Sequence, residues 1–274
     1  MTVDAPERRH TLAVMLATVC GLFVRAWLEL RLRAQGHDPA FATEMSWLLV
    51  MPPTLGLLLF PVLRKDRGFL AAQFPRAGLC LRVVARAVVA GLCLRLAWWS
   101  QVFAGGALGF YRGDRPVIRH VLQFTVDCPA PGALMLGIVV TATLIPVVEE
   151  VTFRGYLLTA LRTFGRPLAI VGSAALFAVF HPPSAYLSAF LVALVFGLQY
   201  WQSGSLWPPV ITHATVNGLV LLDWRCLHGQ WHLPANAIPL WDVAIGATLL
   251  FFAAAGGALA CALRPGHRGD GSPR

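Results

Sequence analysis

Apolar stretches of roughly membrane-spanning length follow one another along this chain and leave little sequence for anything else. Hydrophobic residues make up 57% of the 274 positions, and charged residues make up 13%. An average soluble domain is about 25% charged, and the mean hydropathy here is +0.65. A water-soluble fold and a disordered chain are both excluded, because each would leave too much apolar surface in water. We therefore predict an all-α, polytopic membrane bundle of about eight transmembrane helices.

The predicted spans are apolar runs separated by polar or Gly- and Pro-containing turns. They cover residues 11–30, 46–63, 83–103, 133–158, 168–181, 186–201, 206–222 and 243–263. No internal repeat or linker divides the chain, so residues 1–274 are predicted to form a single integral membrane domain. Residues 265–274 are rich in Gly, Pro and Arg, and we expect them to form a disordered tail.

The net charge of +9 comes from basic residues, nearly all arginine, scattered between the apolar runs. In a topology with both termini in the cytoplasm, thirteen Arg and Lys residues lie on the cytoplasmic side and six on the opposite side. The positive-inside rule favours this orientation. The pattern is typical of topology signals and lipid headgroup contacts, so we expect a bilayer partner and no nucleic acid. The arginine bias is interpreted as bacterial, which indicates the inner (cell) membrane.

Polar residues inside the apolar runs are the candidates for chemistry, since each costs free energy in a membrane unless it has a partner or a function. Three clusters between positions 149 and 217 meet this description. They are Glu149-Glu150 with Arg154, Phe177 with His181, and His213 with Asn217. A membrane histidine is often a link between helices, and a Glu-Glu pair often a solvated helix end. The three clusters together nevertheless indicate a functional site.

Helical spacing separates the roles of the two glutamates. Residues four apart share a helix face, so Glu150 and Arg154 are predicted to form an ion pair. Glu149 is five residues from Arg154, about 140° round the helix, and its carboxylate is left for chemistry. His213 and Asn217 are also four apart. They can therefore present two hydrogen-bonding groups to one ligand.

A proline is expected to shape the helix that carries the glutamates. Pro146 lies three residues before Glu149, and a proline inside a helix removes the hydrogen bond to the carbonyl four residues earlier. We therefore expect a kink near Pro146. We also expect the backbone carbonyl of Ala142 to be released from its usual partner.

The spacing of turns indicates which side chains reach the same depth. The segment around Gly165 reads as a turn between two helices, and Glu149 and His181 each lie 16 residues from it. In an antiparallel hairpin these two side chains reach the same level. His213 follows a second turn at residues 203–205, so a pocket shared by the three side chains is feasible.

In this order, the three clusters resemble the motifs of the CPBP family. This family comprises the CAAX proteases and bacteriocin-processing enzymes, also called the type II CAAX prenyl endopeptidase or Abi family. The resemblance covers residues 130–225, which are expected to form the catalytic core. It implies an intramembrane endopeptidase, which uses a glutamate-activated water to hydrolyse a peptide bond of a membrane-associated protein or peptide.

The resemblance also implies a role for each motif residue. Glu149 is the general base that activates the water, and His181 positions that water or shares its proton. His213 and Asn217 stabilise the oxyanion that forms on the substrate carbonyl. The supporting residues, which hold the helices in register, are Glu150, Arg154 and Phe177.

Two alternatives stay open on sequence grounds. Within the protease class no cofactor is required, but zinc is possible, because Glu149, His181 and His213 are ligands of acceptable type. The chain lacks the His-Glu-x-x-His pattern of many zinc proteases. Outside the class, a non-catalytic immunity or scaffold protein that binds a lipidated or helical peptide in the same cavity would also need these polar groups.

Two cysteines raise a separate possibility. Cys128 and Cys226 fall in loops that the predicted topology puts on the outer face, each beside a span that carries site residues. A disulfide between them would clamp the fourth and seventh spans next to the proposed cavity. Two unpaired thiols are equally compatible with the sequence, because it does not give the Cα separation that a disulfide requires.

Overall fold

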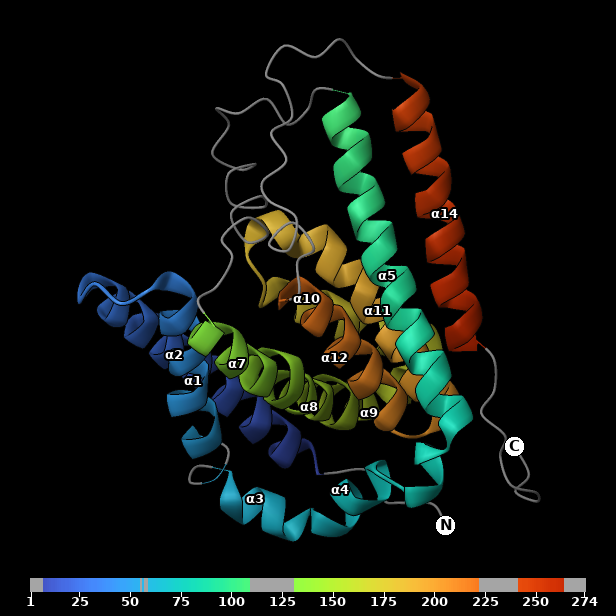
Figure 1. Ribbon diagram of the computed structural model, residues 1–274. Helices are drawn as coiled ribbons and strands as arrows, with labels where there is room; N and C mark the ends of the chain where they lie inside the picture. Colours follow the sequence, from blue (N-terminus) through green and yellow to red (C-terminus); the bar gives the residue numbers. More distant parts are fainter. Residues whose placement is uncertain (1–6, 55, 57–58, 109–130, 222–240, 264–274) are drawn as a thin grey trace.

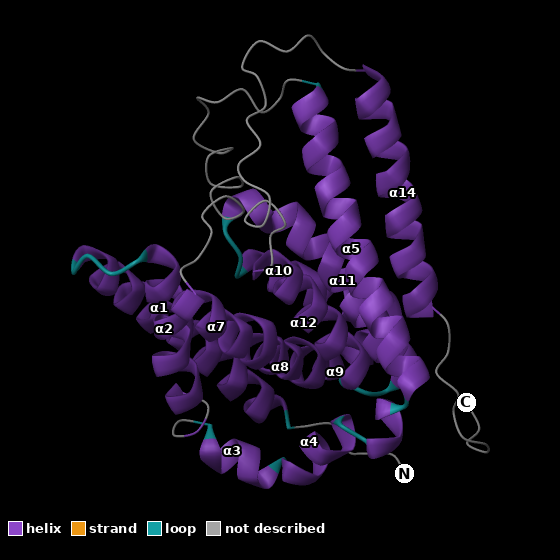
Figure 2. Cartoon of the chain, in the orientation of Figure 1, coloured by secondary structure: helices purple, strands orange, loops and turns teal. Residues whose placement is uncertain are grey.

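The computed structural model describes residues 7–54, 56, 59–108, 131–221 and 241–263, and every regular element within these ranges is a helix (Figure 2). In chain order the elements are α1 (Arg8–Ala34), α2 (Pro39–Pro53), α3 (Phe60–Lys65), α4 (Arg67–Gln73), η2 (Arg76–Leu79), α5 (Leu81–Ala107), α7 (Pro131–Val139), η3 (Val140–Leu144), α8 (Ile145–Glu150), η4 (Val151–Leu158), α9 (Thr159–Leu161), η5 (Arg162–Phe164), α10 (Arg166–Val179), η6 (Pro183–Ala185), α11 (Tyr186–Ser203), α12 (Trp207–Leu221) and α14 (Trp241–Leu263). The predicted all-α class is confirmed.

Three of the described helices are long and apolar enough to cross a membrane. They are Arg8–Ala34, Pro131–Phe164 and Ala244–Leu263. Their outer faces carry large apolar side chains, such as Phe23 and Phe252, that are exposed to the surroundings. Such faces suit contact with lipid. Each of the eight predicted spans overlaps a helix, but the count of eight membrane crossings stays a prediction.

The second predicted span, residues 46–63, differs from the structure. The helix there is α2, which begins at Pro39 and ends at Pro53, and α3 begins only at Phe60. The helix starts early because Asp38 caps it: the Asp38 carboxylate accepts a hydrogen bond from the Phe41 backbone N–H at 2.9 Å. A proline in the first turn adds to this start signal. A reading based on apolar runs alone overlooks both signals.

Two glycines end helices where the sequence predicted turns. Gly165 has a φ of +90° and lies between η5 and α10. Gly204 has a φ of +65° and ends α11. Side chains rarely allow these backbone angles, which glycine adopts readily. Both predicted turns are therefore confirmed.

The helices pack as neighbouring pairs (Figure 1). α1 packs against α2, α10 against α11, and α5 against α14. α12 lies between two of these groups, since it contacts α5 on one side and the elements α7, η3 and α8 on the other. This position matters for function because α12 carries His213 and Asn217.

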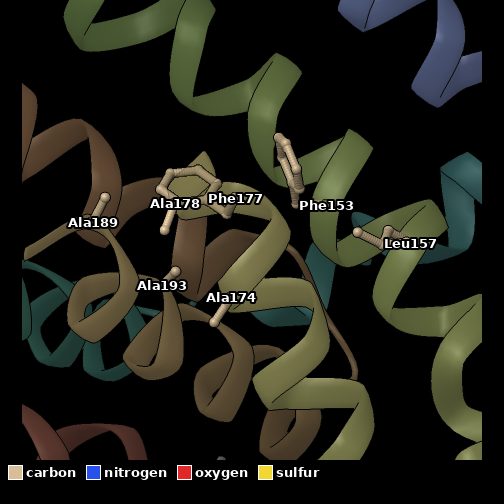
Figure 3. Packing of buried hydrophobic residues seen from close by; sticks show 7 residues of the cluster. All are labelled: Phe153, Leu157, Ala174, Phe177, Ala178, Ala189 and Ala193. Carbon is tan, nitrogen blue, oxygen red and sulfur yellow. The ribbon is translucent and has the colours of Figure 1, made fainter. Parts of the chain in front are cut away.

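The hairpin of α10 and α11 is closed by small side chains. Figure 3 shows the cluster in which Ala174 and Ala178 of α10 lie near Ala189 and Ala193 of α11, together with Phe153, Leu157 and Phe177. Small residues at a helix interface let the two backbones approach closely. Phe153 and Leu157 of η4 belong to the same cluster, so it also packs Phe177, near the end of α10, against the helix Pro131–Phe164.

The long helix Pro131–Phe164 is α-helical only in part. The stretches η3 and η4, which flank α8 on both sides, are π-helical. A π-helix is a wide turn that often marks functional sites. The π-helical stretch η3 ends two residues before Pro146, and the kink expected there stays a prediction.

The predictions for Cys128, Cys226 and the tail 265–274 fall outside the residues that the structure describes. The four described cysteines, Cys20, Cys80, Cys93 and Cys261, are free thiols. The possible Cys128–Cys226 disulfide stays a prediction.

Candidate active site

The carboxylate of Glu150 lies at the centre of a buried polar cluster. Glu150 ends α8 and is fully buried. Its Oε1 accepts a hydrogen bond from Nη1 of Arg154 at 3.1 Å, so the predicted ion pair is confirmed. The same oxygen lies 2.9 Å from Nδ1 of His213. Sequence reasoning missed this second contact, because spacing along one helix does not show which other helix faces it.

Arg154 is completely buried, and its guanidinium group is compensated on several sides. The guanidinium carbon lies 4.6 Å from the ring centre of Phe177 and 5.2 Å from that of Phe196. Nη2 donates a hydrogen bond to the carbonyl of Ala193 at 3.1 Å. Ion pairing, cation–π contact and the carbonyl together offset the cost of burying this charge. Arg154 thus ties η4 to α10 and α11.

Glu149 has a different environment from its neighbour. Its side chain is 16% exposed, and its Oε2 lies 3.7 Å from Nε2 of His213. Among the described residues, His213 is the one polar side chain that the Glu149 carboxylate contacts. The fold therefore uses the carboxylate of Glu150 for packing and leaves that of Glu149 largely uncommitted.

The imidazole of His213 bridges the two glutamates. Glu150 faces its Nδ1 and Glu149 faces its Nε2. The ring stacks on Phe196, with ring centres 4.9 Å apart and an interplanar angle of 24°. Because a carboxylate only accepts hydrogen bonds, Nδ1 carries the hydrogen, and Nε2 is the nitrogen that can gain or donate a proton towards Glu149.

His181 is oriented in the same way by a backbone carbonyl. Its Nδ1 lies 2.9 Å from the carbonyl oxygen of Phe177, which fixes Nδ1 as the donor and leaves Nε2 for other partners. The Phe177 ring lies 4.6 Å from the His181 ring and 6.0 Å from the His213 ring. Phe177, predicted as a supporting residue, thus contacts both histidines as well as Arg154.

Asn217 lies one turn beyond His213 on α12 and binds the long helix. Its Nδ2 donates a hydrogen bond to the carbonyl of Thr141 at 2.9 Å. We expected Pro146 to release the carbonyl of Ala142, which stays a prediction; the carbonyl that Asn217 binds is that of Thr141. In a π-helix the donor lies five residues ahead, so Pro146, which has no N–H, deprives Thr141 of its partner. The Nδ2 of Asn217 donates to this carbonyl in place of the missing backbone N–H.

The hairpin register agrees with the predicted equal depth. Phe153 and Phe177 each lie twelve residues from Gly165, and their rings pack with centres 5.2 Å apart. Direct polar contacts join Glu149, Glu150, Arg154 and His213. His181 reaches this cluster through the ring of Phe177; among the described residues it makes no hydrogen bond or ion pair with either glutamate.

The geometry does not gather ligands for a metal. Among the described residues, no group of three or more His, Cys, Asp or Glu side chains is arranged to hold a metal ion. The possible zinc ligands Glu149, His181 and His213 thus lie near one another without forming such a group. In this arrangement the described residues do not fit a zinc site.

Comparison with known proteins matches residues 131–219 to one family, described as type II CAAX prenyl endopeptidase Rce1-like. No curated protein and no solved structure matches the chain. The matched segment begins with α7 and ends within α12, so it contains every predicted site residue. Residues 131–219 of this apolar, helical membrane protein are therefore similar to the Rce1-like family of type II CAAX prenyl endopeptidases, a family of proteases.

Proposed function

We propose that the chain is an intramembrane endopeptidase in which Glu149 activates a water molecule to cleave a peptide bond of a membrane-anchored substrate. The contrast between the two neighbouring carboxylates carries the proposal. Glu150 is fully buried and engaged by Arg154 and His213, whereas Glu149 is partly exposed and has one long contact, to His213. A general base needs a carboxylate that is held in place but not consumed by the fold.

In the proposed reaction, Glu149 takes a proton from water and the water oxygen bonds to the scissile carbonyl carbon. The negative charge that forms on the carbonyl oxygen is stabilised by N–H donors from His213 and Asn217. His213 serves in its protonated form, with Nδ1–H held by Glu150 and Nε2–H directed at the oxyanion. When the intermediate collapses, the carbon–nitrogen bond breaks, and the leaving amine takes the proton from Glu149.

His181 has a supporting role in this scheme. Its Nδ1 is occupied by the Phe177 carbonyl, so Nε2 is the nitrogen that accepts a hydrogen bond from the attacking water. No cofactor is required in the proposal. The family name indicates CAAX-type peptides as the first substrates to try, with and without a prenyl group.

The whole chain contributes to this function in our proposal. Residues 130–225 form the catalytic core, and the remaining helices belong to the same membrane domain. We propose that both termini face the cytoplasm of a bacterial cell, with the protein in the inner membrane, because the basic residues are biased to that side. An impermeant maleimide added to intact cells should then label exposed Cys80, at the start of α5, only after the membrane is opened. Labelling before opening would reverse the orientation.

The function is tested by comparing peptides in membranes of cells that produce wild-type protein or Glu149→Gln at equal abundance. A substrate should accumulate uncleaved, and its fragments disappear, only in cells with the variant. Identical peptide profiles would contradict the proposed proteolysis. A biological effect that persists in Glu149→Gln would instead favour the non-catalytic, peptide-binding alternative.

A further inference from the structure

Glu44 is a buried carboxylate on α2, outside the family-matched segment. It is 6% exposed, and the Thr141 hydroxyl lies 2.8 Å from each of its two oxygens. Within the described part of the chain, this hydroxyl is its hydrogen-bond donor. One neutral donor compensates poorly for burying a carboxylate among apolar helices. The positive charge of Arg25 also acts on this carboxylate, but no ion pair or second donor to Glu44 is present among the described residues.

The hydroxyl of Thr141 behaves differently from those of nearby threonines. Thr143 donates to the carbonyl of Ile138 at 2.9 Å, and Thr215 donates to that of Ile211 at 2.8 Å. Both stay within their own helix, as helical threonines commonly do. Thr141 instead donates to Glu44 on another helix, so its side chain is directed by α2.

The backbone of Thr141 is engaged by a third helix. The Ile145 N–H is taken by the carbonyl of Val140, and Pro146 has no N–H to give. The Thr141 carbonyl is thereby available to Nδ2 of Asn217. One residue of η3 therefore connects a buried carboxylate on α2 to the last motif residue on α12.

The packing around this link is close. A Cβ atom added at Gly137, one turn before Thr141, would lie 3.5 Å from Oε1 of Glu44 and 2.9 Å from Cδ2 of Leu221. The absence of a side chain at Gly137 thus lets Glu44 of α2 and the end of α12 approach the same face of α7. At this position α2 and α12 therefore both pack closely against α7.

We propose that Glu44 is a positioning residue that acts through Thr141 to orient the side-chain amide of Asn217. The inference rests on the proposed function, in which Asn217 donates to the oxyanion. Because only the NH₂ group of an amide can donate a hydrogen bond, the Thr141 carbonyl determines which way the side-chain amide of Asn217 is turned. One N–H is spent on that carbonyl, and the second is held ready for the substrate. Glu44 keeps the carbonyl in place by holding the Thr141 side chain.

The first test compares two replacements of Glu44 in purified, full-length protein in liposomes, with a fluorogenic farnesylated CAAX peptide as probe. Glu44→Met keeps the volume but removes the acceptor, and should lower kcat about tenfold with KM unchanged. Glu44→Gln keeps an oxygen acceptor for the Thr141 hydroxyl, and its kcat should stay within about twofold of wild type. The melting temperature of Glu44→Met should equal or exceed that of wild type, because an apolar group replaces a buried carboxylate.

The second test measures coupling along the link. Thr141→Val should lower kcat as much as Glu44→Met, and combining the two should cause no further loss. Adding Glu44→Met to Asn217→Ala should also leave kcat unchanged from Asn217→Ala alone. Thr215→Val is the matched control, since its hydroxyl bonds its own helix, and it should cleave like wild type.

Several outcomes would overturn the positioning role. The first is a wild-type kcat in Glu44→Met, and the second is losses of kcat that multiply in the double variants. The third is a Glu44→Gln variant as impaired as Glu44→Met, which would mean that the charge of Glu44 itself acts. Glu149→Gln on the same peptide separates this inference from the proposed function. If Glu149→Gln cleaves normally, the proposed function fails. If Glu149→Gln is inactive and Glu44→Met is normal, only the positioning role fails.

Discussion

Two regions of this molecule hold their helices together by different means. Around the glutamates, polar groups join the helices: one carboxylate, Glu150, contacts η4 and α12, and one guanidinium, Arg154, contacts α8 and α11. Along α5 and α14, the buried residues are mostly small. They include Ala87, Ala90 and Ala97 of α5, and Ala254, Ala258 and Ala262 of α14. Polar contacts fix the orientation of a side chain, whereas small residues fix the distance between helices.

α12 belongs to both regions. One side of it carries His213 and Asn217 towards the long helix, and the other side packs on α5 at Gly91. A Cβ atom at Gly91 would lie 2.6 Å from Cβ of Thr215 and 2.9 Å from the carbonyl oxygen of Thr212. The geometry of the site thus depends on a close helix contact that contains none of its functional groups.

The two neighbouring glutamates should show the clearest difference between loss of catalysis and loss of stability. Glu149→Gln should lower kcat about a thousandfold or more, as removal of a general base does, and should leave the melting temperature unchanged because its carboxylate makes one long contact. Glu150→Gln should lower the melting temperature, because it weakens the ion pair with Arg154. Turnover and thermal unfolding of both variants check this. A wild-type rate in Glu149→Gln would remove the basis of the mechanism.

Disrupting the polar region should lower stability more than disrupting the small-residue region. Arg154→Met leaves the buried Glu150 carboxylate without its cation, so we expect a loss of about 3–5 kcal/mol in the free energy of unfolding. Arg166→Met is the control, since Arg166 is exposed at the start of α10. Denaturant unfolding in detergent measures both. Equal stability of the two variants would show that the buried ion pair is energetically dispensable.

The small-residue region should respond to added volume. Gly91→Ala introduces a methyl group where α12 crosses α5, and we expect a loss of about 1–3 kcal/mol in stability, with kcat lowered because His213 moves. Gly256→Ala on α14 meets nothing within 4 Å and should behave like wild type. Thermal unfolding and peptide turnover of the pair test this. A stable and fully active Gly91→Ala would mean that the contact with α5 does not control α12.

The smallest effect is expected from metal removal. Because the proposed mechanism uses a water activated by Glu149 and no metal, exhaustive chelation should leave the cleavage rate within about twofold. Rates measured before chelation, after it, and after zinc is added back give the comparison. Full loss and full recovery with zinc would overturn the glutamate-activated water.

Much of the polar cluster could be predicted from the sequence because its signals are local. The Glu150–Arg154 pair follows from a spacing of four, and the turns at Gly165 and Gly204 follow from residues that allow a positive φ. The order of the motifs identified the helices that carry them. These features depend on short stretches of chain, so one sequence is enough to find them.

The cross-helix features could not be predicted in the same way. Periodicity does not distinguish a π-helical stretch from an α-helix with a proline, so the hydrogen bond from Asn217 to the Thr141 carbonyl was not predicted. Phe196 lies in an apolar run like many others, and only packing shows that it stacks on His213. Glu44 was overlooked because the apolar run begins after it, although Asp38 already signals a helix that includes it.

The consecutive ion pairs that Glu29 forms with Arg25 and Arg33 in α1 have a consequence for the surrounding bilayer. Arg25 bonds Glu29 at 2.7 Å, and Glu29 bonds Arg33 at 2.6 Å, so the uncharged part of α1 is residues 11–24, about 21 Å long at 1.5 Å per residue. The apolar helix Ala244–Leu263 has 20 residues and is about 30 Å long, which matches an ordinary hydrocarbon core. We expect the bilayer to be thinner beside α1 than beside α14, although the protein covers most of the Arg25–Glu29 pair, whose side chains are 20% and 16% exposed.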